Sequence, residues 1–309
     1  MKILFMGTPD FAVFSLKSLI EAGHEICGVI TQPDKPKGRG YVLTPPPVKV
    51  VAEEAGIPVY QPATLRDEAF ASLLSQLDPE ICVVVAYGKI LPLNVLEYPK
   101  YGCVNVHGSL LPEYRGAAPM QRAIIDGKKT TGITTMYMAE GLDTGDMLLK
   151  DEIEILENDN FEDIHDKLGA CGAALIVRTL KGLEENRIQR QKQDDTKATY
   201  AAKITKSDCL VDFSKSAQTV HDLIRGLSPI PLAFTHTPDG KLLKITKSVI
   251  CADAKKGQAG KIISLENGIT VACCEGAVTL LGVVPEGKKP MSASDFVRGR
   301  KVAVGDILK

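Results

Sequence analysis

The stretch ICVVVA at residues 81–86 decides the fold class of this chain. All six residues are apolar and three are valines, so the stretch predicts a strand that is buried on both faces. Such strands are typical of a parallel sheet with helices on either side. Residues 2–6 (KILFM) form a similar run, and we expect further strands at residues 24–30 and 102–106.

Helical segments separate these strands. Residues 11–22 predict a helix for which Thr8 is a candidate cap and Pro9 suits the first turn. Residues 48–55 and 67–77 predict two more helices. Strands that alternate with helices of this length indicate an α/β domain with a doubly wound, Rossmann-like, mostly parallel sheet.

The pattern changes after residue 130. Two strand-like runs, 132–138 and 147–155, flank a turn, and residues 161–183 predict a long helix. Beyond a helix at 216–226, short strand-like runs recur at residues 231–236, 241–250, 260–265, 268–274 and 277–284. Short strands at this spacing indicate a small OB-like β-barrel.

These patterns divide the chain into two expected domains. We place an α/β catalytic domain at residues 1–186, a polar linker at 187–206 and the OB-like domain at 207–309. The linker assignment depends on residues 187–200, where Gln, Lys and Asp dominate.

Composition indicates a soluble cytoplasmic protein. Hydrophobic residues make up 44% of the 309 residues and charged residues 24%, which is ordinary for a globular chain. The apolar run at the N-terminus stops at Gly7, and no stretch reaches the roughly 18 apolar residues of a membrane span. None of the eight cysteines forms a Cys-x-x-Cys pair, so we expect neither disulfides nor a metal site. No feature indicates an obligate protein partner.

Charge is distributed unevenly along the chain. Residues 1–189 hold 18 Lys and Arg against 26 Asp and Glu, a net charge of −8, whereas residues 190–309 hold 19 against 12, a net charge of +7. A basic half indicates a polyanionic partner such as a nucleic acid, although solvated surface lysines would give the same count.

The first candidate for chemistry is the run NVHGSLLPEYRG at residues 105–116. Asn105 and His107 are two residues apart at the end of an expected strand, so their side chains point the same way. Ligands of doubly wound sheets bind at this edge. The following residues mix Gly, Ser and Pro, so we expect their backbone groups to be free to hydrogen-bond a flat heterocycle. A plain strand exit would give the same pattern.

The second candidate is the loop AEGLDTGD at residues 139–146. Its two glycines permit a tight turn. Asp143 is either a surface turn residue or a partner for His107, because a carboxylate orients an imidazole and stabilises its charged form. A dinucleotide cofactor is disfavoured, because residues 7–11 (GTPDF) lack the glycine spacing of a dinucleotide-binding turn.

Together these motifs resemble the folate-dependent formyltransferase family. The resemblance rests on residues 105–116 followed by GLDTG at 141–145, and it extends over nearly the whole chain. Matching segments are GTPDFA at 7–12, QPDKPKGRG at 32–40, PVK at 47–49, IRGLSP at 224–229 and GDIL at 305–308.

The resemblance implies a specific reaction. An enzyme of this kind would transfer the formyl group of 10-formyltetrahydrofolate to the α-amino group of initiator methionyl-tRNA, giving N-formylmethionyl-tRNA for translation initiation. The donor would serve as a co-substrate, and the reaction needs no metal. Negative charge would develop on the formyl oxygen, where an amide and a protonated imidazole can donate hydrogen bonds.

The resemblance also implies the site residues. The catalytic trio would be Asn105, His107 and Asp143. The folate would contact segments around residues 86–91, 109–112 and the 139–143 loop, with Tyr87, Gly88, Ile90, Leu91, Ser109, Leu110, Leu111, Pro112 and Asp143 as contacts. The tRNA would contact a mobile basic loop at residues 31–44 and the basic second half, with Lys35, Lys37, Arg39, Lys203, Lys206, Arg225, Arg298, Arg300 and Lys301 as phosphate contacts.

Two other interpretations remain open. One is a folate formyltransferase that acts on a small amine, such as glycinamide ribonucleotide or an amino sugar; the basic second half and the basic loop argue against it. The other is a non-catalytic RNA-binding protein, which the presence of all three catalytic residue types argues against.

Overall fold

A computed structural model of the chain describes residues 1–37, 41–251 and 257–309. The chain forms two compact units, and each is built from several segments. The first comprises Met1–Gly116, Gly132–Ile153 and His165–Tyr200, and the second comprises Ala117–Thr131, Glu154–Ile164 and Ala201–Lys309. The boundaries at residues 186 and 207 stay a prediction from sequence. No helix of the described ranges is long and apolar enough to cross a membrane.

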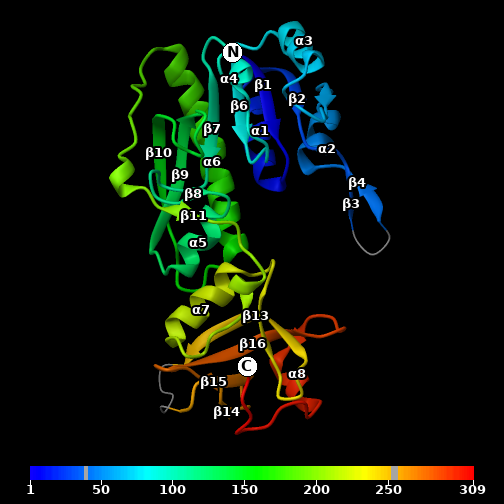
Figure 1. Cartoon of the computed structure of the whole chain (residues 1–309), viewed down its shortest axis with the longest axis vertical. Coiled ribbons are helices and arrows are strands. Elements are labelled where there is room, and N and C mark those ends of the chain that lie inside the picture. Colours follow the sequence, from blue (N-terminus) through cyan, green and yellow to red (C-terminus); the bar gives the residue numbers. More distant parts are fainter. Residues whose placement is uncertain (38–40, 252–256) are drawn as a thin grey trace. The chain divides into compact units, whose positions relative to one another are not determined.

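A seven-stranded sheet with the order β10-β9-β7-β6-β1-β2-β5 is the centre of the first unit (Figure 1). Neighbouring strands from β7 to β5 pair in parallel, and β9 pairs with β7 antiparallel. This is the doubly wound, mostly parallel sheet that the sequence predicts. The strands are β1 (Lys2–Gly7), β2 (Glu25–Ile30), β5 (Val59–Tyr60), β6 (Ile81–Val85), β7 (Cys103–His107), β9 (Thr130–Tyr137) and β10 (Met147–Glu154).

Strand β6 lies at the middle of this sheet because its side chains are apolar on both faces. All five of its residues are buried, as are five of the six residues of β1. The C-terminal ends of β1, β2, β6 and β7 lie at one edge of the sheet, since these strands run in parallel. The residues that follow these ends are the ones that can build a ligand site.

Helices cover the sheet. They are α1 (Asp10–Glu21), α2 (Pro47–Glu54), α3 (Glu68–Leu77), α4 (Leu93–Leu96) and α6 (Phe161–Glu184). The long helix α6 packs directly against the strands, because a Cβ atom at Gly172 would lie 3.0 Å from the Val106 side chain in β7. Thr179 in α6 also shares a hydrogen bond of 2.9 Å with Thr135 in β9.

The start of α1 differs from the prediction. Pro9 is the cap residue and no side chain caps the helix. The Thr8 hydroxyl instead donates to the Tyr87 carbonyl at 3.1 Å and so links the ends of β1 and β6. Thr8 therefore connects two strand ends at the edge where doubly wound sheets generally bind their ligands.

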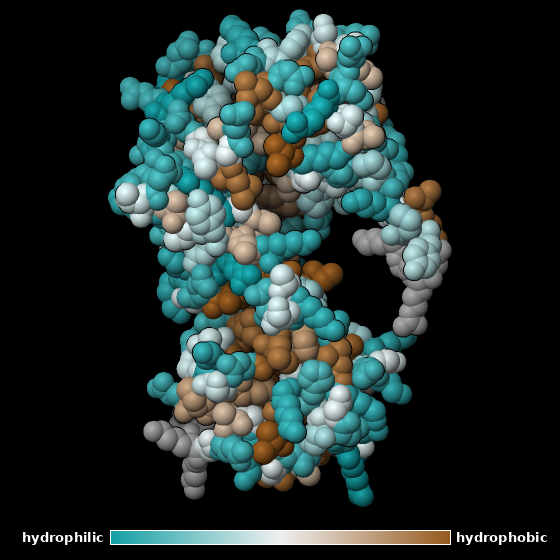
Figure 2. All heavy atoms as spheres, viewed as in Figure 1, coloured by the Kyte–Doolittle hydropathy of each residue, from teal (hydrophilic) through white to brown (hydrophobic). Residues whose placement is uncertain are grey.

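Several short elements were not predicted. Inside the loop at residues 31–47, β3 (Lys35–Lys37) and β4 (Val42–Thr44) form an antiparallel hairpin. The apolar side chains of Val42 and Leu43 are 67% and 66% exposed on it. Figure 2 shows apolar surface on this projecting hairpin. Strand β8 (Arg115–Gly116) pairs with β11 (Tyr200–Ala201), and single 3-10 turns form at Asp195–Lys197 and Ser207–Cys209.

The second unit contains a curled antiparallel sheet with the order β12-β13-β16-β15-β14, as expected for an OB-like barrel. Its strands are β12 (Ala233–His236), β13 (Leu242–Cys251), β14 (Ile262–Ser264), β15 (Ile269–Ala272), β16 (Ala277–Pro285) and β17 (Met291–Ser292), which pairs with β16. Its helices are α5 (Pro119–Ile125), α7 (Ala217–Gly226) and α8 (Ala293–Arg298). Buried side chains such as Ile245, Val271 and Leu280 form its own apolar core.

Candidate active site

Strand β7 carries the first two polar residues of the site. It runs between β6 and β9, and its Val104 and Val106 are buried. Asn105 and His107 alternate with these valines, so both side chains lie on the other face. His107 is the last residue of the strand and is 6% exposed, whereas Asn105 is partly exposed.

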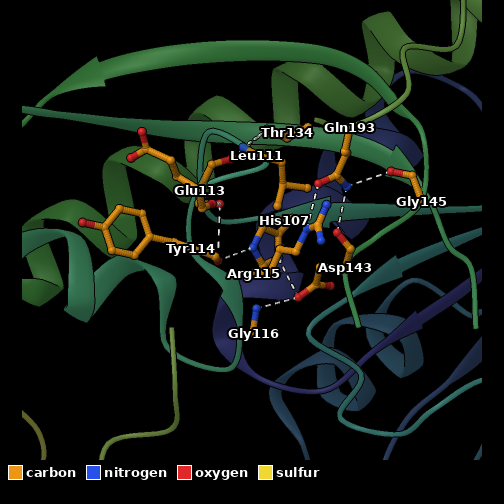
Figure 3. A network of polar contacts seen from close by, with 11 residues as sticks. His107, Leu111, Glu113, Tyr114, Arg115, Gly116, Thr134, Asp143, Gly145 and Gln193 are labelled. Atoms are coloured by element: carbon orange, nitrogen blue, oxygen red, sulfur yellow. Dashed lines mark hydrogen bonds and ion pairs between the residues drawn. The ribbon is translucent and has the colours of Figure 1, made fainter. Parts of the chain in front are cut away.

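His107 is held between a carbonyl group and a carboxylate (Figure 3). Its Nε2 lies 2.9 Å from the Tyr114 carbonyl oxygen, and its Nδ1 lies 3.7 Å from Oδ2 of Asp143. A carbonyl oxygen only accepts hydrogen bonds, so Nε2 carries a hydrogen and donates it. Nδ1 is therefore the nitrogen left for exchanging a proton, and it faces the Asp143 carboxylate.

Asp143 comes from the loop between β9 and β10. Its carboxylate Oδ2 accepts a hydrogen bond from the Gly116 backbone N–H at 2.8 Å. The loop adopts a tight turn at this point, because Asp143 has a φ of +52° and Gly145 approaches the chain closely. A Cβ atom at Gly145 would lie 1.8 Å from the Tyr137 carbonyl oxygen, so only glycine fits there. The structure thus brings the predicted carboxylate to the predicted imidazole.

Two buried residues that sequence reasoning missed support this loop. Gln193 donates from Nε2 to the carbonyl oxygens of Asp143 and Gly145, at 2.7 and 2.8 Å. Arg115 donates from Nε to Oε1 of Gln193 at 2.9 Å. Arg115 stands inside the quoted run at 105–116, but Gln193 lies in the polar segment interpreted as a linker, where its side chain gives no signal of burial.

The backbone at residues 109–112 is not free, contrary to expectation. Thr134 donates from Oγ1 to the Ser109 carbonyl at 2.7 Å and accepts from the Leu111 N–H at 3.1 Å. The Lys150 ammonium donates to the Leu111 carbonyl, and Pro112 O accepts from the backbone N–H of Thr199 at 3.3 Å. These groups are satisfied by the protein, which gives the segment a fixed shape.

The side chains of residues 109–112 are mostly turned inward. Ser109 is fully buried and donates to the Glu113 carbonyl at 2.6 Å. Leu111 packs against Met136 and Met147. Leu110 and Pro112 are partly exposed and remain the candidates for side-chain contact with a ligand in this segment.

The segment at residues 86–91 separates into buried and open positions. Tyr87 and Leu91 are 2% and 3% exposed and belong to the apolar core, and burial raises the pKa of the Tyr87 phenol to about 12. Gly88 and Ile90 are exposed, Ile90 to 76%. Of these four predicted folate contacts, Gly88 and Ile90 are therefore the accessible ones.

The predicted tRNA contacts also separate by exposure. Arg225 is 5% exposed, and its guanidinium donates to Asp222 at 2.6 Å and to the carbonyl oxygens of Leu156 and Asp159. The guanidinium of Arg225 binds groups inside its own unit, so we remove Arg225 from the candidate phosphate contacts. Arg298 is exposed but ion-pairs with Asp295. The other exposed candidates are Lys35, Lys203, Lys206, Arg300 and Lys301.

Part of the predicted basic loop lies outside the described residues. Arg39 falls there, and Lys37 is described only as the last residue of β3.

A shallow depression of about 470 Å³ in the second unit is lined by Leu265, Val297, Arg300, Lys301, Val302, Ala303, Val304 and Asp306. It contains none of the residues that could perform the chemistry, but it brings two candidate phosphate contacts together.

With this geometry established, the chain can be compared with known proteins. Residues 1–180 match the family described as formyl transferase, and residues 203–301 match the formyl transferase C-terminal domain. The methionyl-tRNA formyltransferase of Bacillus licheniformis is 48% identical over 98% of this chain and 96% of its own length. That of Clostridium novyi is 48% identical over 100% of both chains.

Solved structures share the fold at lower identity. The methionyl-tRNA formyltransferase of Clostridium thermocellum has a TM-score of 0.56 and 18% identity over 82% of this chain and 95% of its own. An N-formyltransferase of Helicobacter canadensis, solved with folinic acid and dTDP-3-aminofucose, has a TM-score of 0.67 and 18% identity over 91% and 98%. The chain belongs to the formyl transferase family, and within it to the methionyl-tRNA formyltransferases.

Proposed function

We propose that this protein transfers the formyl group of 10-formyltetrahydrofolate to the α-amino group of initiator methionyl-tRNA. The observation that carries the proposal is the placement of Asp143 Oδ2 at 3.7 Å from Nδ1 of His107, at the end of the strand that also carries Asn105. The product, N-formylmethionyl-tRNA, starts translation, so the cytoplasm is the expected location.

The reaction exchanges one C–N bond for another. The methionyl amine attacks the formyl carbon, and the bond between that carbon and folate N10 breaks. The proton that the amine loses ends on N10, so tetrahydrofolate leaves as a neutral amine. Negative charge develops on the formyl oxygen in between, and this is the charge that a preorganised donor must stabilise.

Asn105 is the proposed donor to that oxygen. Its side chain is partly exposed at the carboxyl end of β7, and no hydrogen bond within the described part of the chain occupies its amide. A side-chain amide can donate without any change of protonation state. Removal of one such donor typically costs about 2.7–4 kcal/mol of transition-state stabilisation.

His107 and Asp143 are the proposed pair for the proton. Nε2 of His107 is held by the Tyr114 carbonyl, so Nδ1 takes part in the transfer from the amine to N10. An imidazole suits both steps because its ordinary titration lies near neutrality. Asp143 faces Nδ1 from 3.7 Å and orients the ring, and the Gly116 N–H fixes the carboxylate.

The folate and tRNA surfaces are parts of the same proposal. The exposed Gly88 and Ile90, with Leu110 and Pro112, are proposed to line the pterin site. The β3–β4 hairpin and the exposed cations of the second unit are proposed to contact the tRNA backbone. Solved relatives crystallised with tetrahydrofolic acid or with 5-N-formyl-THF support a folate donor.

A small-amine formyltransferase is the alternative that the experiment must exclude. Purified protein is incubated with labelled 10-formyltetrahydrofolate and either methionyl-tRNA, glycinamide ribonucleotide or a dTDP-amino sugar. We expect the label on methionyl-tRNA alone. Label on a small amine with none on methionyl-tRNA would overturn the proposal.

Variants of the proton-transferring pair test the mechanism. We expect His107→Ala and Asp143→Ala each to abolish turnover, because each removes one half of the proposed proton-transfer pair, while tRNA binding in a filter assay survives. Asp146→Asn is the matched control: it changes a carboxylate of the same loop for which the described structure shows no side-chain hydrogen bond. A near-wild-type rate in either alanine variant would contradict the assigned roles.

A further inference from the structure

The segment at residues 190–199 is bound to both loops that form the site. The guanidinium of Arg190 lies 3.9 Å from the centre of the Tyr137 ring, just before the Asp143 loop. The backbone of Gln191 exchanges two hydrogen bonds with Met147, just after that loop. Thr199 accepts from the Tyr114 N–H at 2.8 Å with Oγ1 and from the Arg115 N–H at 2.9 Å with its carbonyl.

Within this segment, Gln193 is the buried residue. It is 6% exposed, whereas the residues on either side of it are exposed. Its side-chain amide has two N–H groups and uses them on the carbonyl oxygens of Asp143 and Gly145, at 2.7 and 2.8 Å. Gln193 therefore spans the turn that presents the Asp143 carboxylate.

Arg115 determines which way this amide points. It is 2% exposed, and its Nη2 donates to Asp195 at 2.7 Å while its Nε faces Gln193 at 2.9 Å. A guanidinium has donors only, so the oxygen of the Gln193 amide must face it and the NH₂ must face the loop. The buried arginine thus turns both donors of Gln193 toward the Asp143 turn (Figure 3).

The stretch that contains Arg115 also fixes Asp143 through a second contact. The residue after Arg115 is Gly116, whose N–H binds the Asp143 carboxylate at 2.8 Å. Asp143 is consequently held at its backbone through Gln193 and at its side chain through Gly116. Its φ of +52° is a conformation that residues other than glycine seldom adopt, so the turn needs such support.

We infer that Gln193, oriented by Arg115, is a positioning residue that sets the Asp143 carboxylate against His107 for formyl transfer. The inference rests on the proposed function of the site. A displacement of about 1 Å in such a group can cost about 100-fold in rate. Gln193 is buried, so we expect no direct contact between its side chain and either substrate.

The test compares Gln193→Glu and Gln193→Ala with Gln189→Glu and Gln189→Ala, which change an exposed glutamine nearby. Glu at position 193 keeps the size and the acceptor for Arg115 but loses both donors to the loop. We expect kcat to fall about 100-fold in both Gln193 variants, the pH–rate profile to change shape, and KM for folate and tRNA to stay near wild type. Wild-type kcat in Gln193→Glu would overturn the inference.

A second experiment tests whether Gln193 affects the rate of formyl transfer through Asp143. In an Asp143→Asn background, measured by single-turnover formylation, Gln193→Ala should have little further effect, because residues that act as one unit are not additive. A full additional loss there would show an independent role and overturn the inference.

A third measurement does not need formyl transfer. Amide hydrogen exchange at residues 139–146 should accelerate in Gln193→Ala while the second unit stays protected. Unchanged exchange in this loop would overturn the inference even in an active enzyme. If the wild-type protein did not formylate methionyl-tRNA, the proposed function would fail while this measurement still reported on the loop.

Discussion

Asp143 combines two demands that conflict in a single residue. The proposed role needs its carboxylate to face His107, and the turn gives its backbone a φ of +52°. Aspartate tolerates this region better than most residues, because its short side chain can bond nearby backbone groups. Here the side chain is bound by Gly116 instead, so the strain is held by contacts from outside the loop.

Of the two glycines in the loop, Gly145 is the less able to accept a side chain. We expect Gly145→Ala to lower kcat strongly and to destabilise the protein by about 1–3 kcal/mol, because the new methyl group would meet the Tyr137 carbonyl at 1.8 Å. Steady-state kinetics and urea unfolding measure both effects. In Gly141→Ala, the control, the atoms nearest to the methyl group belong to the Thr144 side chain rather than to the backbone, so a smaller loss is expected. Equal losses would contradict the steric argument.

His221 gives the second unit a dependence on pH. Its Nε2 donates to the Glu157 carbonyl and its Nδ1 accepts from the Ser248 hydroxyl, which suits a neutral ring. Burial lowers the pKa of His221 below its ordinary value of 6.5, and the charge of Arg225 adds to this, against the opposing effects of Glu157 and Asp222.

The sign of the pH effect follows from that direction. Because the pKa is lower in the folded state, the stability that His221 contributes is present above the unfolded pKa of 6.5 and is lost as the pH falls through the folded value. We expect urea unfolding from about pH 8 to about pH 5 to show a falling free energy of unfolding, with a weaker fall in His221→Gln. Since burial also lowers the pKa of His24, the difference between the two proteins is the measurement. Parallel curves would contradict the prediction.

At the scale of elements, the β3–β4 hairpin depends on a polar anchor at its base. The Asp34 carboxylate accepts from Gln61 at 2.8 Å and from Lys49 in α2 at 3.0 Å, and these contacts, the one from Gln61 most, lower the pKa of Asp34. Gln61 also donates to the Gln32 carbonyl at 2.8 Å. The residues before the hairpin are thus attached to two neighbouring segments of the first unit.

Weakening this anchor should impair the use of tRNA as a substrate more than the use of folate. We expect Asp34→Ala to lower kcat/KM for methionyl-tRNA about fivefold, the order of one partly exposed ion pair, with KM for folate unchanged. Glu53→Gln, an exposed change on the same helix, is the control. An equal loss for both substrates would place the anchor in the folate site instead.

The elements also show where sequence reasoning succeeds. Strands such as β6 are predictable because a continuous apolar run has one physical explanation, burial on both faces. The hairpin β3–β4 and the pair β8–β11 are two or three residues long and depend on partners, which composition does not reveal. The burial of Gln193 could not be predicted for the same reason, because it depends on contacts with the loops around residues 115 and 143.

The candidate site shows the same contrast. His107 and Asp143 could be paired in advance because an imidazole and a carboxylate in separate loops have a chemical reason to meet. The state of the backbone at residues 109–112 could not, because Thr134 and Lys150 reach it from other strands. Arg225 was misjudged because a cation in a basic region gives no sign that a buried carboxylate and two carbonyl groups bind it.

At the scale of the whole molecule, the uneven distribution of charge leads to a final prediction, on the salt dependence of tRNA binding. Residues 190–309 carry a net charge of +7 and include the exposed Lys203, Lys206, Arg300 and Lys301. Each phosphate that such cations neutralise releases counterions, so log affinity should fall with log salt by roughly 0.7–0.9 per contact. We expect KM for methionyl-tRNA to rise steeply with salt and KM for folate to change little.

Single-residue variants test which cations produce the slope of log affinity against log salt. Arg300→Ala and Lys301→Ala should each reduce the slope by about one contact and weaken all tRNAs alike, as phosphate contacts do. Glu266→Gln is the control, because it changes an exposed charge of the second unit without removing a cation. A salt slope that is the same for tRNA and folate would show that the basic half serves solubility rather than binding, and phosphate recognition would then have to lie in the first unit.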